Sequence, residues 1–252
     1  MLFKSKLKAS LIHLALSILL VGLCIGSILF FFYPSLFIAI SDFKEVATLI
    51  VSIDLILGPL LTFVVFQPEK KSLKFDLSVI AAIQISALVY GAYALYQVHP
   101  VYITFNIDRF TIISAKDASP EKARYDEYKV SKYSAGTLAF AKMPDNQSKR
   151  IELILSAASG GEDLDQREEY YEPYKSNISQ IIAKSLDPKI IFKTDKAKLK
   201  AKSFLSKHHD HLDSFAYLPL NSLKKDAIII LNKKTGDPIS TIAIDPWQFS
   251  KK

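Results

Sequence analysis

The first 98 residues contain three long stretches that are almost free of charge. The first runs from Ala9 to Ser41 and the third from Leu77 to Val98, and neither contains Asp, Glu, Lys or Arg. The second, Val46–Phe66, contains a single charged residue, Asp54. A helix that crosses the hydrocarbon core of a bilayer needs about 20 mostly apolar residues. The sequence therefore predicts three membrane-spanning helices, at Ser10–Tyr33, Val46–Phe66 and Leu77–Tyr96.

The first stretch also has the positively charged start of a secretory signal peptide. Its apolar core is longer than that of a signal peptide, however. It ends in the bulky run Phe30–Tyr33, where a cleaved signal would have a small-x-small site. We therefore predict an uncleaved signal anchor.

Lysines in the flanks of these stretches predict their orientation. The tail before the first stretch and the loop at 67–76 carry three lysines each, whereas the loop between the first two stretches has Lys44 alone. Short lysine-rich flanks stay in the cytoplasm, so the N-terminus is predicted to be cytoplasmic. The chain then consists of a three-helix transmembrane domain, 1–98, and an extracytoplasmic domain, 99–252. In a Gram-negative cell this predicts a multi-pass inner-membrane protein with its C-terminal domain in the periplasm.

The formal net charge of the chain is +7. A mildly basic domain tethered to a membrane is explained by contact with anionic lipid, so we predict membrane lipid as a partner and no nucleic acid. The single cysteine, Cys24, lies in the first stretch, and the chain has no disulfide framework.

The first stretch contains a glycine pair that is typical of close helix packing. Gly22 and Gly26 are four residues apart, so both lie on one helix face and allow another backbone to approach. The partner is either the protein's own helices or the membrane helix of another protein. His13 either reaches the interface or a backbone carbonyl, or meets a carboxylate on a partner helix. Gly22, Gly26 and His13 are therefore candidate contacts for a partner's membrane helix.

Asp54 lies about 18 Å of helix from the cytoplasmic end of the second stretch, near the bilayer centre. A carboxyl group at that depth faces other helices or is protonated. Pro59 removes the hydrogen bond to the carbonyl of Leu55 and predicts a kink beside Asp54. We predict an intramembrane polar site of Asp54, Pro59 and Tyr90, in which Tyr90 bonds to Asp54 and Gln84 lies nearer the cytoplasm. The alternative is that Asp54 carries protons or ions.

After residue 98 the pattern becomes that of an α+β domain. Strands are predicted at Val101–Phe105, Phe110–Ile113, Thr137–Ala141, Phe215–Leu220, Ala227–Leu231 and Ile239–Ile244. Helices are predicted at 120–129, 145–159, 172–186 and 195–208, the last with Leu199, Phe204 and Leu205 as buried residues. The last two strands form a hairpin around Thr235-Gly236-Asp237. The order of the strands in the sheet does not follow from the sequence.

The outer domain contains few groups that suggest chemistry. His208, His209, Asp210, His211 and Asp213 form the one cluster with metal-ligand residue types, and no distant Cys or His group completes it. We interpret this cluster as a solvated helix end followed by a polar loop. Neither a nucleophile elbow nor a phosphate-binding glycine loop is present in the sequence. The sequence therefore predicts no catalytic residues, no cofactor, no metal and no enzymatic activity.

The tyrosines of the outer domain fall into two groups. Tyr170, Tyr171 and Tyr174 lie in one segment, and three more lie between residues 125 and 133. Tyrosine is favoured at protein interfaces because it buries area and keeps a polar tip. The alternative is that one ring of each group packs into the core. Tyr170, Tyr171 and Tyr174 are the candidate interface of the outer domain.

Several blocks of the sequence together resemble a known family. The blocks are D-L-I-L-G-P-L-L-T at 54–62, K-K-S-L-K-F-D at 70–76, R-E-E-Y-Y-E-P-Y at 167–174 and D-P-W at 245–247. They resemble the TfpX/TfpZ family of type IV pilin accessory proteins, over essentially the whole chain. The resemblance implies an inner-membrane protein that promotes the assembly or stability of its cognate major pilin, without enzymatic activity. It also favours the interface interpretation of the tyrosines at 170, 171 and 174.

The predicted function is therefore a non-enzymatic accessory role in type IV pilus biogenesis. The expected partner is the major pilin, held by its membrane helix and by its head domain. The alternative is a membrane sensor or transport component in which Asp54 couples the membrane part to the outer domain. A third possibility, an enzyme that modifies pilin, is disfavoured because no catalytic group was found. The oligomeric state is left open by the sequence.

Overall fold

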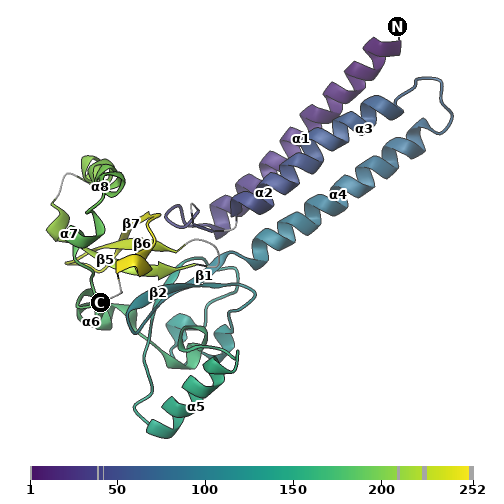
Figure 1. The fold of residues 1–252 in the computed structure, drawn as a ribbon. Coiled ribbons are helices and arrows are strands. Elements are labelled where there is room, and N and C mark those ends of the chain that lie inside the picture. The colour runs from purple at the N-terminus through teal and green to yellow at the C-terminus, as the bar shows by residue number, and fades with distance from the viewer. Residues whose placement is uncertain (1, 39, 42, 209–210, 223–225, 250–252) are drawn as a thin grey trace. The chain divides into compact units, whose positions relative to one another are not determined.

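The computed structural model describes residues 2–38, 40–41, 43–208, 211–222 and 226–249. The chain divides into two compact units (Figure 1). The first consists of Met1–Tyr33 and Asp42–His99, and the second of Pro34–Ser41 and Pro100–Lys252. The short segment between the first two helices thus belongs with the C-terminal part of the chain.

The first unit is built from three long apolar helices. The first is α1 (Leu2–Phe32) and the third is α4 (Leu73–Gln97). The second is continuous over Phe43–Val65 and consists of α2 (Phe43–Ser52), a π-helical turn (Ile53–Leu57) and α3 (Gly58–Val65). All three are long and apolar enough to cross a membrane. Their large apolar side chains are mostly exposed within the unit, which is typical of helices that face lipid. The prediction of three apolar helices is confirmed.

Two glycines let α4 approach the second helix closely. A Cβ atom added to Gly91 would lie 2.4 Å from Cγ1 of Ile50, and one added to Gly58 would lie 1.9 Å from Nε2 of Gln84. Real Cβ atoms do not approach other atoms this closely, so neither position accommodates a larger residue without movement. Packing of apolar helices depends on such small residues at the points of closest approach.

The second unit contains a seven-stranded mixed sheet in the order β4-β3-β1-β2-β5-β6-β7. Its strands are β1 (Pro100–Asn106), β2 (Arg109–Ser114), β3 (Thr137–Ala141), β4 (Tyr171–Glu172), β5 (Phe215–Asn221), β6 (Ala227–Asn232) and β7 (Pro238–Ile242). The pairs β1–β3 and β2–β5 are parallel, and the other neighbours are antiparallel. The predicted strands are confirmed, and β4 is an additional one.

Four helices accompany the sheet: α5 (Gln147–Ala158), α6 (Ile178–Ile182), α7 (Pro188–Ile191) and α8 (Asp195–His208). The predictions of α5 and α8 are confirmed. The helix predicted at 120–129 is wrong, because two 3-10 turns, Pro120–Lys122 and Asp126–Tyr128, form there instead. The helix predicted at 172–186 shrinks to α6, because the chain first pairs as β4 and then passes through a 3-10 turn.

Both faces of the sheet are buried. In β6, Ala227, Ile229 and Leu231 point into one hydrophobic cluster, and Ile228 and Ile230 point into another. This follows from the two-residue period of a strand. A strand that is covered on both sides is apolar throughout, which explains the run A-I-I-I-L.

The segment Pro34–Ser41 completes one of these clusters. Phe37 and Ile40 are almost fully buried against β1, β5 and β6. The hydroxyl of Thr241 donates to the carbonyl of Leu36 at 2.8 Å, and that of Ser222 donates to the carbonyl of Ile40 at 3.1 Å. This segment is therefore a structural part of the C-terminal unit as well as the link between two apolar helices.

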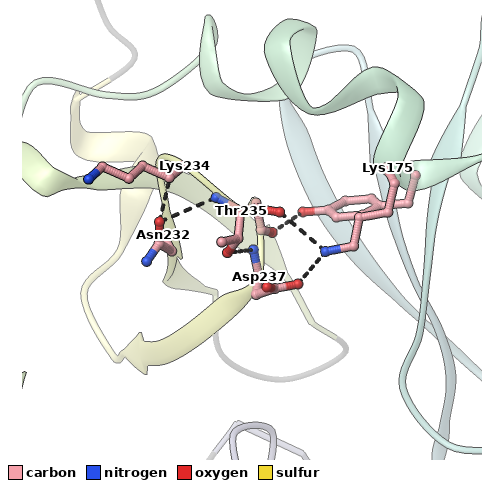
Figure 2. Close-up of polar contacts among 7 residues, drawn as sticks. Lys175, Asn232, Lys234, Thr235 and Asp237 are labelled. Atoms are coloured by element: carbon pink, nitrogen blue, oxygen red, sulfur yellow. Dashed lines mark hydrogen bonds and ion pairs between the residues drawn. The ribbon is translucent and has the colours of Figure 1, made fainter.

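The turn between β6 and β7 is held by polar contacts from a neighbouring segment (Figure 2). The side chain of Lys175 pairs with the carboxylate of Asp237 and donates to the carbonyl of Thr235 at 3.2 Å. The Tyr174 hydroxyl donates to the carbonyl of Gly236 at 2.7 Å. Gly236 has a φ of +72°, which L side chains rarely adopt.

Substitution of Gly236 by alanine should destabilise the second unit by about 2–3 kcal/mol. Alanine would pay the cost of a positive φ, and its Cβ would lie 2.7 Å from Cγ1 of Ile178. Gly160→Ala is the matched control, because Gly160 has a φ of +83° with no atom within 4 Å of the added Cβ. Thermal unfolding of the full chain, followed by near-UV circular dichroism, should show a larger loss for Gly236→Ala. Equal losses would mean that the contact with Ile178 is unimportant.

Candidate functional site

The predicted polar site around Asp54 lies at a π-helical turn, Ile53–Leu57. The backbone N–H of Gly58 donates to the carbonyl of Ile53, five residues back. With this register the next carbonyl, that of Asp54, would accept from residue 59, which is a proline without an N–H. The turn and Pro59 together leave the carbonyl of Asp54 without a backbone donor. The sequence analysis predicted that the carbonyl of Leu55, one residue later, would lose its donor, because in an α-helix residue 59 bonds to residue 55.

A glutamine from the neighbouring helix takes the place of that donor. The side-chain amide of Gln84 in α4 donates to the carbonyl of Asp54 at 3.3 Å, and Gly58 provides the space for it. The hydrogen bond predicted between Tyr90 and Asp54 is absent from the described residues, and Tyr90 is 71% exposed. The physical reason is helix rotation. Six residues separate Gln84 from Tyr90, so they lie about 120° apart around α4 and only one of them faces the second helix.

The carboxyl group of Asp54 is enclosed but has no hydrogen-bond donor among the described residues. The residue is 3% exposed, and both carboxyl oxygens lack a partner there. Most buried polar atoms in proteins are paired, so an unpaired carboxyl marks a position that packing alone does not explain. Asp54 remains a candidate site residue on this ground.

The N-terminal half of α1 contacts the same region through polar side chains. The Ser10 hydroxyl donates to the carbonyl of Pro59 at 2.9 Å. Nδ1 of His13 lies 2.6 Å from Oγ1 of Thr62, within hydrogen-bond distance. His13 thus contacts the protein's own second helix, and this contact makes it a weaker candidate for binding a partner's helix.

Gly22 and Gly26 lie on a different face of α1. The buried residues of this helix are Ser17, Val21 and Ile28, which follow the same stripe as Ser10 and His13. Gly22 and Gly26 are exposed, and a Cβ added to either would meet no atom within 4 Å. They therefore play no part in packing within this unit, where the close approaches occur at Gly58 and Gly91.

Two of the three tyrosines predicted to form an interface are buried instead. Tyr171 is 0% exposed; its hydroxyl donates to the carbonyl of Asp165 at 2.5 Å and accepts from Thr104 at 3.0 Å. Tyr174 is almost fully buried and holds the β6–β7 turn. The interface prediction is wrong for these two residues, because both their rings and their hydroxyls are satisfied inside the domain. Tyr170 is half-buried at the edge of the same core.

Tyr171 belongs to a group of buried tyrosines. Its ring packs edge-on against the rings of Tyr102 and Tyr128, at centroid distances of 5.3 and 5.7 Å. The Tyr128 hydroxyl accepts from the backbone N–H of Tyr174 at 3.0 Å and donates to the carbonyl of Glu172. Burial raises the pKa of Tyr128 to about 12, so its hydroxyl stays protonated at neutral pH. The group ties β1 to the segment around β4.

A buried glutamate lies next to this group. Glu168 is 0% exposed, and its Oε1 accepts from the backbone N–H of Ser119 at 2.7 Å, whereas its Oε2 has no partner among the described residues. Burial raises the pKa of Glu168 above its usual value of 4.5, despite that hydrogen bond. Burial also raises the pKa of Asp165, which is 7% exposed. Burial thus makes the ionised form of both carboxyl groups less favourable than it is in water.

Glu168→Gln should make the stability of the domain less dependent on pH. A carboxyl whose pKa is raised by folding stabilises the fold below its unfolded pKa, and this contribution is lost as pH rises through the folded pKa. The wild-type unfolding temperature should therefore fall from about pH 4.5 towards neutrality, and by less in Glu168→Gln, whose amide does not titrate. Glu152→Gln, an exposed glutamate in α5, is the control. Identical pH profiles for the two variants would contradict this origin of the pH dependence.

The structure describes three residues of the predicted His/Asp cluster: His208, His211 and Asp213. Among the described residues, no group of three His, Cys, Asp or Glu side chains could hold a metal ion. His209 and Asp210 of the predicted cluster lie outside the described residues. The ring of His208 packs against the ring of Phe204 at 4.5 Å.

One candidate surface was missed from the sequence. On α5, Ile151, Ile154 and Leu155 are exposed, and Leu153 is the buried residue. The three exposed residues have the i, i+3, i+4 spacing of one helix face. The apolar periodicity of 147–158 was the available signal, but it was used only to predict a helix. An exposed apolar face of this kind is a candidate protein contact.

Comparison with known proteins connects the chain with fimbriae. It is 39% identical over 112 residues to a fimbrial assembly protein of Dichelobacter nodosus, serogroups C1 and C2, a match that covers 44% of this chain and 86% of that protein. The chain belongs to the family of fimbrial assembly proteins. Two further members from the same organism, of serogroups I and E1, are each 29% identical over 248 residues, covering 96% of both chains.

Similarity within the family therefore extends over both units of the chain. No family model matches the sequence, and no solved structure matches it. The predicted resemblance is confirmed at the level of fimbrial, or pilus, assembly, whereas the names of these relatives do not mention TfpX or TfpZ.

Proposed function

We propose that this protein is a non-enzymatic accessory protein of type IV pilus biogenesis that binds the major pilin in the inner membrane and stabilises it before assembly. Membership of the fimbrial assembly family involves the chain in fimbrial biogenesis. The observation that carries the more specific proposal is the exposed Gly22–Gly26 face of α1.

A membrane location is supported by the three apolar helices and their exposed apolar side chains. The packing of Pro34–Ser41 with Pro100–Lys252 is compatible with the predicted three crossings. A segment between the first two helices and a domain after the third lie on the same side of a membrane when the second and third helices both cross it. The lysine-rich flanks then assign that side to the periplasm.

The glycine face of α1 suits the membrane helix of a pilin, which is a membrane helix that carries a soluble head. Close approach of two helices in lipid requires small residues, because lipid tails are as apolar as leucine and only tight packing favours association. Leu19 and Phe30 are exposed on the same side of α1 and would flank the docked helix. A glycine pair that served internal packing would contact another helix of the unit, which Gly22 and Gly26 do not.

The head of the pilin would contact the exposed face of α5. Ile151, Ile154 and Leu155 replace the tyrosines as the candidate apolar surface of the second unit. The pilin would thus be held at two points, one in the membrane and one outside it. Asp54 and Gln84 would then have the role of holding the second helix against α4.

A membrane sensor or transport component is the second candidate function. It is favoured by one observation, the carboxyl group of Asp54 without a donor among the described residues. In that function Asp54 would bind a proton or cation, and Asp54→Asn would abolish the activity. In the pilin-holding function the isosteric Asp54→Asn variant should keep pilus assembly close to normal.

Photo-crosslinking in cells tests the proposal. A photoreactive residue at Leu19 on the glycine face, and another at Leu155 on α5, should each recover the major pilin. The controls are Ile83 on an exposed face of α4 and Tyr133, an exposed residue of the second unit. Pilin recovered from Leu155 but not from Leu19 would confine binding to the outer unit. Pilin recovered from neither position, in cells that make abundant pilin, would overturn the proposal.

A further inference from the structure

Most of the chain's net charge is concentrated in one short segment of the second unit. Residues 184–208 contain eight lysines, two aspartates, no arginine and no glutamate. Their net charge is +6, whereas the formal net charge of the whole chain is +7. The rest of the chain is therefore nearly neutral, and the basic character of the protein is local to α7, α8 and their flanks.

Several lysines of this segment lie on the outside of the domain. Lys189 of α7, Lys193 between the helices, and Lys198 and Lys202 of α8 are all exposed. Of these four, Lys198 has an ion pair with a carboxylate of the described residues, namely with Asp195 at 3.2 Å. Neighbouring acidic groups therefore leave most of this positive charge uncompensated.

The opposite side of α8 anchors the helix to the sheet. Ala197, Ala201 and Phe204 pack with residues of β5, β6 and β7 in one hydrophobic cluster. Figure 1 shows α7 and α8 beside this end of the sheet. The lysines are thus displayed by a helix with a defined orientation on its domain.

Two large apolar side chains project among the lysines. Leu199 was predicted to be buried, but it is 69% exposed, and Ile190 of α7 is 52% exposed. Leu199 lies two positions from each of the buried residues Ala197 and Ala201, so it points away from the sheet. Lys189, Lys198 and Lys202 help to line a groove of about 660 Å³ that also contains Phe192, Leu205 and Asp213.

We propose that the lysine face of α7 and α8 binds the anionic surface of a phospholipid bilayer, with Leu199 and Ile190 inserted among the headgroups. Helices that lie in the plane of a membrane interface combine lysines with exposed apolar residues in this way. Lysine acts as a flexible point charge, whereas arginine supplies the bidentate geometry that a specific carboxylate or phosphate requires. A face whose basic residues are all lysines therefore suits a diffuse anionic surface.

This proposal rests on the membrane location in the proposed function, which keeps the second unit within reach of a bilayer. Lipid is favoured over an acidic protein because the charge is spread over two helices and surrounds protruding apolar side chains. Anionic lipid attracts each lysine near its surface with a free energy that corresponds to about fivefold in affinity. Such binding would hold the outer unit in a fixed orientation at the membrane surface.

The full chain in lipid nanodiscs allows a direct test, because Cys24 is its single cysteine. In a Cys24→Ala background, a fluorophore is attached at Leu199→Cys, and spin-labelled lipid serves as the quencher. Quenching is compared between phosphatidylcholine discs and discs that contain phosphatidylglycerol, at low and high salt. The test variant replaces four lysines of the face by glutamine: Lys189, Lys193, Lys198 and Lys202. The control variant replaces four exposed lysines elsewhere in the second unit: Lys122, Lys129, Lys132 and Lys149.

We expect strong quenching in the anionic discs at low salt, and much weaker quenching at high salt, because salt screens exposed charges. The test variant should fall to the level of the phosphatidylcholine discs, and the control variant should behave like the wild type. Absent quenching, or equal quenching in both lipids, would overturn the proposal. So would recovery of an acidic protein by a crosslinker at Leu199 without lipid quenching. Pilin crosslinking from Leu19 is scored separately, so a negative lipid result leaves the proposed function standing.

Discussion

Replacing both Gly22 and Gly26 by leucine is expected to lower the cellular level of the major pilin about tenfold, equivalent to about 1.4 kcal/mol of binding. The protein itself should remain stable, because a Cβ at either position meets no atom within 4 Å. Two leucine side chains would, however, hold a docked helix away from the backbone of α1. Immunoblots of pilin and of the protein itself, in the same membranes, measure both effects.

A matched pair on another helix separates the glycine face from a general effect of added bulk. Ala82 and Ser86 of α4 are also small, four residues apart and exposed. The variant Ala82→Leu with Ser86→Leu should leave the pilin level unchanged. If this variant and the glycine variant lower pilin equally, the glycine face has no special role. If neither does so, the membrane half of the two-point proposal is wrong.

Tyr171→Ala is expected to unfold the second unit, with a loss of about 3–5 kcal/mol. The substitution removes a fully buried ring that packs against Tyr102 and Tyr128, and it leaves a cavity between β1 and the segment around β4. Limited proteolysis of the full chain and its thermal unfolding both measure this loss. Tyr133→Ala, at an exposed tyrosine, should change stability by less than about 0.5 kcal/mol.

Tyr171→Phe distinguishes a core residue from an interface residue. It keeps the ring but removes the hydrogen bonds to the carbonyl of Asp165 and from Thr104, at a cost of about 1–3 kcal/mol. The folded fraction of this variant should support a normal pilin level. A folded Tyr171→Phe protein with a strongly reduced pilin level would show that the hydroxyl contacts a partner, contrary to its burial.

The arrangement of helices and strands was largely predictable from local patterns. Charge-free stretches of more than 20 residues predicted the three apolar helices, and alternation or short apolar runs predicted β1, β2, β3, β5, β6 and β7. The wrong predictions concern segments whose structure depends on contacts with other parts of the chain. Pro173 and the pairing of β4 with β3 shortened the helix predicted at 172–186. The apolar loop Pro34–Ser41 was treated as a connection although its composition is that of a core segment.

The candidate site was predictable only in part. Asp54 and Pro59 were recognisable because a carboxyl group and a proline are rare inside an apolar helix. The partner of Asp54 was predicted wrongly, because the π turn shifts the hydrogen-bond register by one residue and helix rotation turns Gln84, not Tyr90, towards it. Likewise the tyrosines at 171 and 174 were assigned to an interface, since residue type alone does not separate a buried tyrosine from an exposed one.

The sequence by itself determined most of the helices and strands, which helices are apolar enough to span a membrane, and that the charge of the second unit is concentrated around α8. These properties depend on composition and on periods of two or 3.6 residues within a single segment. Only the tertiary structure decided which glycines serve internal packing, which tyrosines are buried, and which side chain donates a hydrogen bond to the carbonyl of Asp54. Each of these depends on the rotation and register of one segment against another distant in the chain, and no local period carries that information.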